Sequence, residues 1–341
     1  MIKKRSVIWA GILLQFSAFT QADTFQAPLV EQSLLLDASS KDFAVVVGER
    51  GHVLIASSPT VPFQQVNMPL TTTLTAVDTI GDSVYVAGHD ATIMFSADKG
   101  QSWKVQLNQP ELERPFLDIL FFDEAHGISV GAYGLFYRTE DGGDTWTSEL
   151  HASLLNPLDI EYLEEIKAED ESFYEQELNS ILPHINRVYL NNGRLYAAGE
   201  TGLLAYSDDQ GRSWQRYELD YAGSFFDIRQ LSDDLLIAAG LRGAVYVHNG
   251  DNAWTAVDSC TTATLNSIIP TDDGNVLIVG NNGAVLTVDI ARLQANSSGA
   301  CGENGVKYQQ IPSKSAIATV ISKNESATAV TADGLYPLTL K

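Results

Sequence analysis

A unit of two strands joined by a tight turn recurs seven times and constrains the fold more than any other feature of the chain. In six units the turn begins at a glycine, and Thr331 stands at that place in the seventh. Most spacings are close to forty residues, the length that a four-stranded propeller sheet, or blade, requires. We therefore predict an all-β fold, a seven-bladed β-propeller. The units are residues 45–57, 84–96, 128–139, 196–207, 237–248, 277–288 and 328–339.

The outer strand of each blade is predicted to begin with an aromatic residue. Six such positions follow the repeat units: Phe63, Trp103, Trp146, Trp214, Trp254 and Tyr308. The seventh unit ends after its third strand, while the segment that begins at Phe25 has no place in any unit. We expect residues 25–30 to pair beside residues 335–340, so that an N-terminal strand closes the ring and removes an open sheet edge.

The charge balance excludes one class of partner. The chain has 21 Lys and Arg against 43 Asp and Glu, a formal charge of −22, and 45% of its 341 residues are hydrophobic. Such a chain buries an ample core but repels phosphate backbones and anionic lipid surfaces. We expect no nucleic-acid partner, and a monomer when the protein is free.

The first 22 residues have the pattern of a secretory signal peptide. A basic start that ends at Arg5 precedes an apolar run over 7–19, and Thr20 and Ala22 place small residues before the expected cleavage site. We predict cleavage after Ala22, a propeller over 23–341, a periplasmic location and no direct membrane insertion after cleavage. The alternative is an uncleaved anchor, which the shortness of the apolar run disfavours.

Two cysteines, Cys260 and Cys301, remain in this oxidising compartment, and their even number predicts a disulfide. Cys260 follows the outer strand of unit five, whereas Cys301 lies in a long insertion before the outer strand of unit six. These loops nominally emerge at opposite ends of a blade. The insertion must therefore bend back for the two sulfur atoms to meet.

Three units continue into the pattern S/T-x-D-x-G-x-x-W. The hydroxyl and the carboxylate are suited to the backbone N–H groups of a tight turn, the glycine accepts a positive φ, and the tryptophan covers the gap between neighbouring sheets. We expect a structural role for all three copies. Their residues are Ser96, Asp98, Gly100 and Trp103; Thr139, Asp141, Gly143 and Trp146; and Ser207, Asp209, Gly211 and Trp214.

These motifs resemble the Asp-boxes of BNR-repeat propellers. The segment 117–131, which runs into 139–146, looks most like the photosystem II assembly-factor branch of that class. The resemblance implies a non-enzymatic protein that binds a membrane-protein client as an assembly or accessory factor of an envelope complex. Similar BNR propellers are associated with RND-type exporters. Because this chain is acidic where the photosynthetic factors are expected to offer a basic face, an RND accessory role stays open as an alternative.

One acidic insertion, about residues 152–183, interrupts the repeat between units three and four. Apolar residues recur in it at steps of three and four, which predicts one or two amphipathic helices. A solvated flap over the rim and a partner-docking surface are both compatible with this pattern. Our candidate contact residues are Glu164, Glu165, Glu169 and Asp170.

The seven repeat turns are predicted to converge at the mouth of the central channel, where propellers bind ligands. The alternative is a ring of ordinary solvated turns. We expect no metal, because the six histidines lack HxH or HExxH spacing, and no cofactor, because no Walker-type or GxGxxG nucleotide loop is convincing. The candidate partner-binding residues of the mouth are Glu49, Arg50, His89, Asp90, Tyr133, Glu200, Arg242, Asn281, Asn282 and Asp333.

A sialidase-like glycoside hydrolase is the enzymatic alternative, because sialidases share Asp-boxes and the propeller fold. That chemistry needs three arginines on the substrate carboxylate, a tyrosine nucleophile and an acid. Arg50, Arg242 and Tyr133 are predicted at the mouth, but the early first blade lacks the arginine that sialidases carry there, and the chain has seven units rather than six. We therefore expect no catalytic residues.

Overall fold

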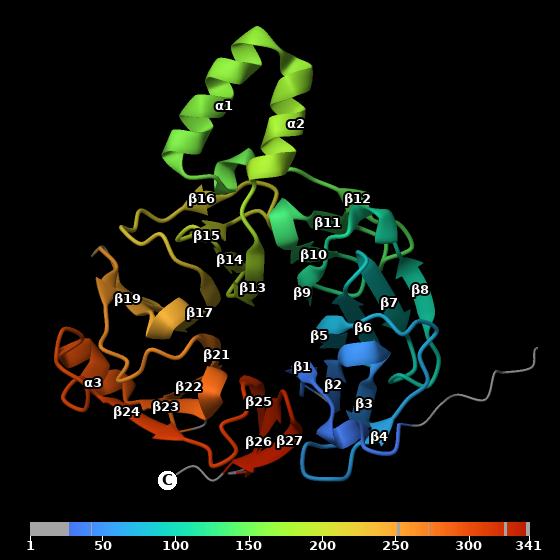
Figure 1. The fold of residues 1–341 in the computed structure, drawn as a ribbon, viewed down its shortest axis with the longest axis vertical. Coiled ribbons are helices and arrows are strands. Elements are labelled where there is room, and N and C mark those ends of the chain that lie inside the picture. Colours follow the sequence, from blue (N-terminus) through green and yellow to red (C-terminus); the bar gives the residue numbers. More distant parts are fainter. Residues whose placement is uncertain (1–26, 42, 251–252, 272, 324–325, 339–341) are drawn as a thin grey trace, which may run out of the picture.

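Seven antiparallel sheets stand around one axis, and the chain passes through them in order (Figure 1). This computed structural model describes residues 27–41, 43–250, 253–271, 273–323 and 326–338. Six sheets have four strands in sequence order, and the described part of the seventh has three. The predicted series of seven repeated sheets, the six outer strands and the helical insertion are confirmed. The predicted signal peptide, residues 1–22, lies outside the described residues.

The blades are numbered along the chain, and each begins with its innermost strand. Blade 1 contains β1 (Leu35–Ser39), β2 (Ala44–Gly48), β3 (Val53–Ala56) and β4 (Gln64–Gln65). Blade 2 contains β5 (Leu74–Ile80), β6 (Ser83–Gly88), β7 (Thr92–Ser96) and β8 (Lys104–Leu107). Blade 3 contains β9 (Phe116–Phe121), β10 (Gly127–Gly131), β11 (Phe136–Thr139) and β12 (Thr147–Ser148).

The remaining blades repeat this order. Blade 4 contains β13 (Ile185–Asn191), β14 (Arg194–Gly199), β15 (Leu204–Ser207) and β16 (Gln215–Arg216). Blade 5 contains β17 (Phe225–Ser232), β18 (Leu235–Gly240), β19 (Val245–Asn249) and β20 (Thr255–Ala256). Blade 6 contains β21 (Leu265–Pro270), β22 (Val276–Gly280), β23 (Ala284–Val288) and β24 (Val306–Gln310), and blade 7 contains β25 (Ile317–Lys323), β26 (Ser326–Thr331) and β27 (Gly334–Leu338).

The repeat glycine is required by a close backbone approach at the end of the second strand in six blades. A Cβ atom on Gly48 would lie 2.2 Å from the carbonyl oxygen of Leu34, and one on Gly280 would lie 2.0 Å from that of Thr264. The other four glycines meet the carbonyl that precedes their own inner strand at 2.1–2.3 Å. Any side chain there would push the inner strand away, which explains why the glycine marks the repeat.

The predicted closing strand is wrong over residues 27–30. These residues form a turn and the start of the 3₁₀ helix η1 (Val30–Gln32), while 25–26 and 339–341 lie outside the described residues. Pro28 has no N–H group for a sheet, and the Ala27 N–H donates to Gln65 Oε1 in blade 1 at 2.9 Å. Blades 7 and 1 meet instead through η1 and a shared apolar cluster that includes Leu35, Leu54 and Val330.

The three Asp-boxes form the predicted turns. In the first, Ser96 Oγ accepts the Gly100 N–H at 2.7 Å, and Asp98 accepts the backbone N–H and the hydroxyl of Ser102 at 2.8 and 2.6 Å. The tryptophan N–H of Trp103 donates to the Gly100 carbonyl at 3.0 Å. Hydrogen bonds from Ser102 and Ser96 lower the pKa of Asp98 to about 2. The second and third boxes repeat the serine or threonine and aspartate bonds.

The predicted disulfide between Cys260 and Cys301 is confirmed, with Cα atoms 5.2 Å apart. Helix α3 (Ile290–Ala295), capped by the Asp289 side chain, turns the chain after β23 so that residues 296–305 return toward blade 5. Asp258 holds both partners, because its carboxylate accepts the backbone N–H groups of Cys260 at 3.0 Å and Cys301 at 3.1 Å.

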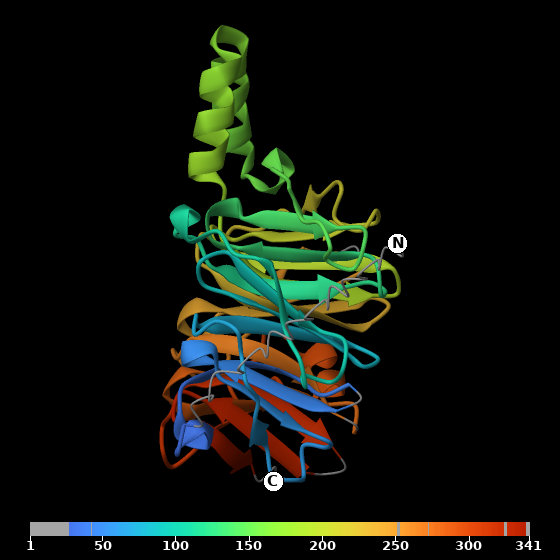
Figure 2. The same cartoon turned by 90° about the vertical axis from the view of Figure 1, so that its right-hand side faces the viewer.

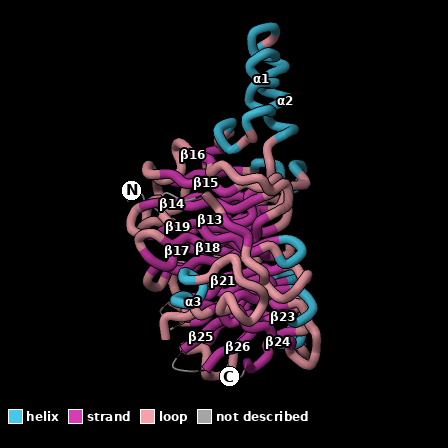
Figure 3. The backbone as a smooth tube through the Cα atoms, turned by 90° about the vertical axis from the view of Figure 1, so that its left-hand side faces the viewer, coloured by secondary structure: helices cyan, strands magenta, loops and turns pink. Residues whose placement is uncertain are grey.

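The acidic insertion forms a helical hairpin of α1 (Pro157–Glu169) and α2 (Glu171–Ile181), which projects from the rim (Figures 1 and 2). Asn156 and Asp170 cap the two helices. Leu155, Leu163, Leu178 and Leu182 pack in a small core of their own. The tube drawing shows how the two helices stand apart from the body of strands (Figure 3).

Gly334 tests the contact that joins the two ends of the ring. Its φ is +101°, and an added Cβ would lie 1.9 Å from the Glu31 carbonyl oxygen in η1. Gly334→Ala should lower the free energy of unfolding by about 1–2 kcal/mol because alanine is strained at this positive φ. The clash of its Cβ with the carbonyl should add about 1–3 kcal/mol to that loss. Gly193→Ala is the control, because Gly193 has φ +83° and open space. Equal urea midpoints for the two variants would contradict a role of η1 in closure.

The Asp-box carboxylate predicts an acid-dependent contribution to stability. The folded pKa of Asp98 lies below the unfolded value of about 3.9, so its contribution is complete above that value and is lost as the pH falls toward about 2. The difference in urea midpoint between wild type and Asp98→Asn should therefore shrink from pH 5 toward pH 2. Asp220→Asn, an exposed site outside the boxes, is the control. A difference that stays constant with pH would exclude the Asp98 carboxylate as the cause.

Candidate functional site

The turns between second and third strands all lie at the same end of the channel and are anchored alike. In every blade the first turn residue donates its N–H to the carbonyl that precedes the inner strand. Examples are Glu49 to Leu34 at 3.0 Å and Ala332 to Ala316 at 2.9 Å. The turns of blades 1, 3, 5 and 6 are the 3₁₀ segments η2 (Glu49–Gly51), η4 (Ala132–Gly134), η6 (Leu241–Gly243) and η7 (Asn281–Gly283).

Six of these turns hold a non-glycine residue in the left-handed region, which L residues rarely adopt. Its φ is +54° at Arg50, +53° at Tyr133 and +56° at Arg242. Each such residue costs about 1–2 kcal/mol relative to ordinary backbone. Residues kept in this conformation are concentrated at binding sites, because the retained side chain outweighs the local cost.

The predicted mouth residues lie where the sequence placed them, on the turns. Arg50 has 79% of its side chain exposed, and Tyr133 is 50% exposed. Glu49 and Glu200 are half-buried, since they accept the N–H groups of Leu34 and His184. The remaining predicted residues are exposed: His89, Asp90, Arg242, Asn281, Asn282 and Asp333.

A ring of polar side chains lies one step deeper, and the sequence analysis missed its aspartates. In every blade the pairing between the first and second strands shifts register near the start of the first strand. The first residue after this shift pairs with the residue that precedes the repeat glycine, or Thr331 in blade 7. This residue is polar in six blades. Around the axis the ring positions are Asp37, Ala76, Asp118, Arg187, Asp227, Ser267 and Thr319.

The ring carboxylates join successive blades. Asp37 accepts the N–H of Val77 in blade 2 at 3.0 Å. Asp118 accepts that of Val188 in blade 4 at 2.7 Å, and Asp227 that of Ile268 in blade 6 at 2.8 Å. Asp78, which lies two residues beyond the ring position in blade 2, accepts the Phe121 N–H of blade 3 at 2.9 Å. These buried carboxylates therefore act as cross-blade acceptors.

The guanidinium of Arg187, the ring residue of blade 4, reaches toward two of the ring aspartates. Its Nη1 donates to Asp118 at 3.3 Å and lies 3.8 Å from Asp37 Oδ1, while its Nε is buried without a hydrogen-bond partner among the described residues. Burial opposes the charge of this guanidinium, but Asp118, Asp37 and Asp227 outweigh burial and raise its pKa. Burial also raises the pKa of Asp118 to about 7, although the Arg187 charge opposes the rise.

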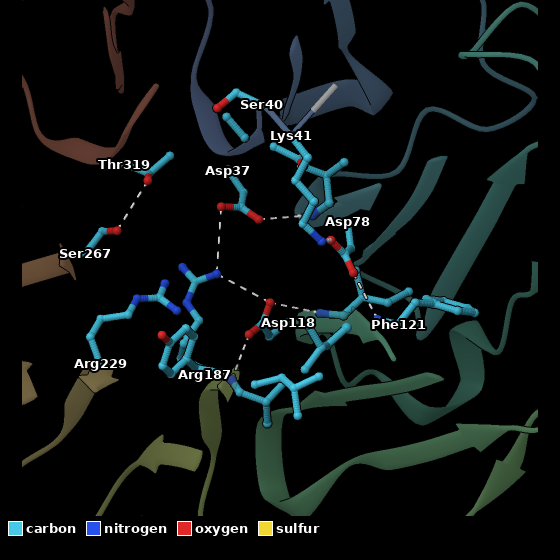
Figure 4. A pocket seen from close by; sticks show the side chains of 18 residues that line it. Asp37, Ser40, Lys41, Asp78, Asp118, Phe121, Arg187, Arg229, Ser267 and Thr319 are labelled. Carbon is cyan, nitrogen blue, oxygen red and sulfur yellow. Dashed lines mark hydrogen bonds and ion pairs between the residues drawn. The ribbon is translucent and has the colours of Figure 1, made fainter. Parts of the chain in front are cut away.

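A cavity of about 480 Å³ extends from the ring along the inner strands (Figure 4). Arg187 points toward Asp37 and Asp118, and Arg229 approaches from the neighbouring blade. Lys41 lies toward the end remote from the turns and pairs with Asp78 at 2.6 Å. The cavity thus offers guanidinium, ammonium and carboxylate groups together, so it suits polar backbone and side-chain groups better than an apolar ligand.

The missed carboxylates leave a signal in the sequence. Each stands within an otherwise apolar inner strand, as in LLLDAS around Asp37, FLDIL around Asp118 and FFDIR around Asp227. A carboxylate surrounded by buried hydrophobic residues needs several donors. Searching the inner strands for such residues, in addition to the turns, would have found the ring.

The acidic insertion contacts the mouth through its base. The Gly134 N–H of η4 donates to the Pro183 carbonyl at 3.0 Å, and Arg114 Nη1 donates to Asn179 Oδ1 of α2 at 2.9 Å. The rings of Tyr133 and His184 meet edge to face with centroids 4.5 Å apart. The predicted contact residues Glu164, Glu165, Glu169 and Asp170 are all exposed on the hairpin.

Among the residues that the structure describes, no group of three or more His, Cys, Asp and Glu side chains is arranged to hold a metal ion. In the same part of the chain, no helix has the length and apolar character that a membrane crossing requires.

Comparisons with known proteins point to one family. The family model for photosynthesis system II assembly factor YCF48 matches residues 105–290. Photosystem II assembly lipoprotein Ycf48 of Synechococcus sp. (strain CC9902) is 27% identical over 170 residues, 49% of this chain and 44% of that protein. Photosystem II assembly protein Ycf48 of Thermosynechococcus vestitus is 24% identical over 201 residues, 51% of this chain and 56% of that protein. The chain spans about half the length of these curated relatives.

Solved structures share the fold at low identity. A structure of YCF48 bound to D1 peptide has a TM-score of 0.64 and 14% identity, covering 93% of this chain and 96% of that one. YCF48 from Cyanidioschyzon merolae has a TM-score of 0.62 and 17% identity, covering 90% of this chain and 96% of that one. These likenesses establish a shared propeller architecture.

Asp118 provides the test of the buried ring. Asp118→Ala removes the acceptor of the Val188 N–H and the nearest carboxylate of Arg187, so we expect the free energy of unfolding to fall by about 3–5 kcal/mol. Asp208→Ala is the matched control, because it breaks the exposed pair with Arg194 and should cost about 0–1 kcal/mol. Urea unfolding at pH 7 measures both. Equal losses would show that the ring carboxylate does not hold blades 3 and 4 together.

Proposed function

The chain belongs to the family of the photosynthesis system II assembly factor YCF48, and from this premise we propose that it is a non-enzymatic, exported protein that binds a protein client. In this proposal it serves as an assembly or accessory factor of an envelope complex, and the client is a membrane protein. The relative whose structure is described as bound to D1 peptide supports a peptide segment as the bound part of the client.

The single observation that carries the proposal is the set of side chains on strained turns at the channel mouth. Arg50, Tyr133 and Arg242 occupy left-handed backbone where glycine would fit without steric strain, and they are exposed. The two arginines contribute no core packing, whereas Tyr133 also contacts His184 at the base of the hairpin. Retention of the arginines is therefore better explained by contact with a partner than by stability.

A periplasmic location fits the disulfide and the predicted signal peptide over 1–22, with the propeller in residues 23–341. In this compartment the free protein is proposed to be a monomer. The formal charge of this chain, −22, favours a client with a basic surface. An accessory role beside an RND-type exporter is retained as the alternative within this class.

The enzymatic alternative, a sialidase-like glycoside hydrolase, has weaker support. Arg50, Tyr133 and Arg242 belong to three different blades, and Tyr133 packs its ring against His184 while its carbonyl accepts from Arg114. No carboxylate partner is placed beside the Tyr133 hydroxyl among the interactions of the described residues. Turnover of a fluorogenic sialoside by the purified protein would overturn the non-enzymatic proposal.

The mouth is tested by the double variant Arg50→Gly/Arg242→Gly. Relief of left-handed strain, about 1 kcal/mol per residue, offsets the entropy that glycine adds to the unfolded chain, so the melting temperature should stay the same or rise slightly. Client capture should fall about tenfold, as expected when central contact residues are removed. Crosslinking of tagged protein in its native envelope, followed by quantitative mass spectrometry, measures the capture.

Arg212→Ala is the matched control for this experiment. Arg212 is an exposed arginine paired with Glu140 in an Asp-box loop, at the channel end opposite the mouth turns. Its removal should leave capture unchanged. If the double glycine variant captures the same partner in the same amount as wild type, the mouth does not bind the client.

A further inference from the structure

The hairpin α1–α2 carries a second contact surface that differs in chemistry from the mouth. We propose that one face of this hairpin binds a basic amphipathic helix of a partner protein. The inference rests on the client-binding role proposed above, and it names the chemistry of a second contact.

The hairpin is attached to the blades at its base. Arg114 holds Asn179, and Arg216 Nη1 donates to the Leu154 carbonyl at 2.8 Å. A Cβ on Gly134 would lie 2.3 Å from Leu182 Cβ, so the foot of α2 sits directly on the blade 3 turn. Beyond this foot the two helices extend away from the blades (Figures 1 and 2).

Three large apolar side chains of the hairpin remain exposed: Leu158 at 77%, Tyr162 at 46% and Phe173 at 46%. They share one face. The Tyr162 hydroxyl meets Glu177 Oε1 at 3.3 Å, which places these two residues on the same side of the helix pair. Leu158 precedes Tyr162 by four residues and Phe173 precedes Glu177 by four, so each lies one turn away on that side. We call Leu158, Tyr162, Phe173 and Glu177 the apolar face.

Carboxylates surround the apolar face. Residues 157–181 contain nine Asp and Glu against one lysine. Glu165 follows Tyr162 by three residues, and Asp170 precedes Phe173 by three, so both border the face. The single lysine, Lys167, lies 4.9 Å from the centroid of the Tyr174 ring, within the pair of helices rather than on this face. The local field is therefore strongly negative around a partly apolar surface.

This combination selects one kind of occupant. A second copy of the chain, at a formal charge of −22, would be repelled, and so would an anionic membrane surface. A partner that covers Leu158, Tyr162 and Phe173 must bring apolar groups at helical spacing and cations at its edges. An amphipathic helix with leucine-like residues at i, i+3, i+4 and i+7, flanked by lysine or arginine, meets both requirements.

The test uses a defined probe, a fluorescein-labelled peptide of lysine and leucine, about 18 residues or five helical turns long, with leucines at i, i+3, i+4 and i+7. The fluorescence anisotropy of this peptide, followed as the full mature protein is added, measures the affinity between the two. Tyr162→Ser/Phe173→Ser should weaken binding about tenfold, because both substitutions remove central apolar contacts. The sites are half exposed, so the fold should persist, and the melting temperature checks this.

Glu171→Gln/Glu175→Gln is the matched control. Each glutamate lies two residues from Phe173, a rotation of about 200°, and so faces the other side of the hairpin. This variant removes two charges and should change affinity less than about threefold, the size expected of a screened remote charge. A scrambled peptide of the same composition should bind clearly more weakly than the amphipathic one.

Three results would overturn the proposal: no binding of the amphipathic peptide, equal binding of the scrambled peptide, or equal weakening by both double variants. Any of these leaves the mouth proposal separately testable, because that experiment uses Arg50 and Arg242 and the native client. Loss of client capture by the mouth variant together with a negative peptide result would retain the client-binding function and reject the hairpin contact.

Discussion

The approach of one carbonyl oxygen to one glycine sets the geometry on which the rest of this propeller depends. In six blades the second strand comes so close to the start of the inner strand that no Cβ can be accommodated. The next residue then donates its N–H to the same carbonyl, and the chain must turn within three residues. Because of this constraint, similar turns lie at one end of the channel. The residues of these turns stand at the mouth, whatever their side chains are.

The inner strands also place charged side chains inside the channel. Asp37, Asp118 and Asp227 are nearly free of solvent contact, a placement that is unfavourable unless each oxygen finds donors. Each of these carboxylates accepts one backbone N–H from the next blade, so the groups that are expensive to bury also align neighbouring blades. Arg187 balances part of the negative charge while one of its nitrogens stays without a partner among the described residues. These hydrogen bonds between blades line the channel with polar side chains in fixed positions, where an apolar core would otherwise lie.

Sequence patterns predicted the repeat and failed where a contact depends on distant parts of the chain. The glycine positions, the aromatic starts of the outer strands and the Asp-boxes are local patterns, and all were recoverable. The N-terminal strand was wrong because Pro28 and the bond from Ala27 to Gln65 direct that segment toward blade 1. The pairing of Cys260 with Cys301 could be expected from the compartment, but the turn made by α3 and the anchoring by Asp258 could not. The buried aspartates were missed because polar residues were sought in the turns and loops at the mouth and not within the inner strands.

The mouth and the hairpin are mechanically linked, and this link bears on how a client would be held. Tyr133 is both a mouth residue and, through His184 and Arg114, a neighbour of the hairpin base. The foot of α2 packs directly on the blade 3 turn through Gly134, Pro183 and Leu182. If both proposed surfaces contact one client, the client would be bound more tightly than by either alone, because the second contact forms at a high effective concentration. The two proposed contacts differ in chemistry, because the mouth carries charged residues of both signs and amides while the hairpin carries carboxylates around apolar side chains. A client that matched only one of them would therefore be bound less well.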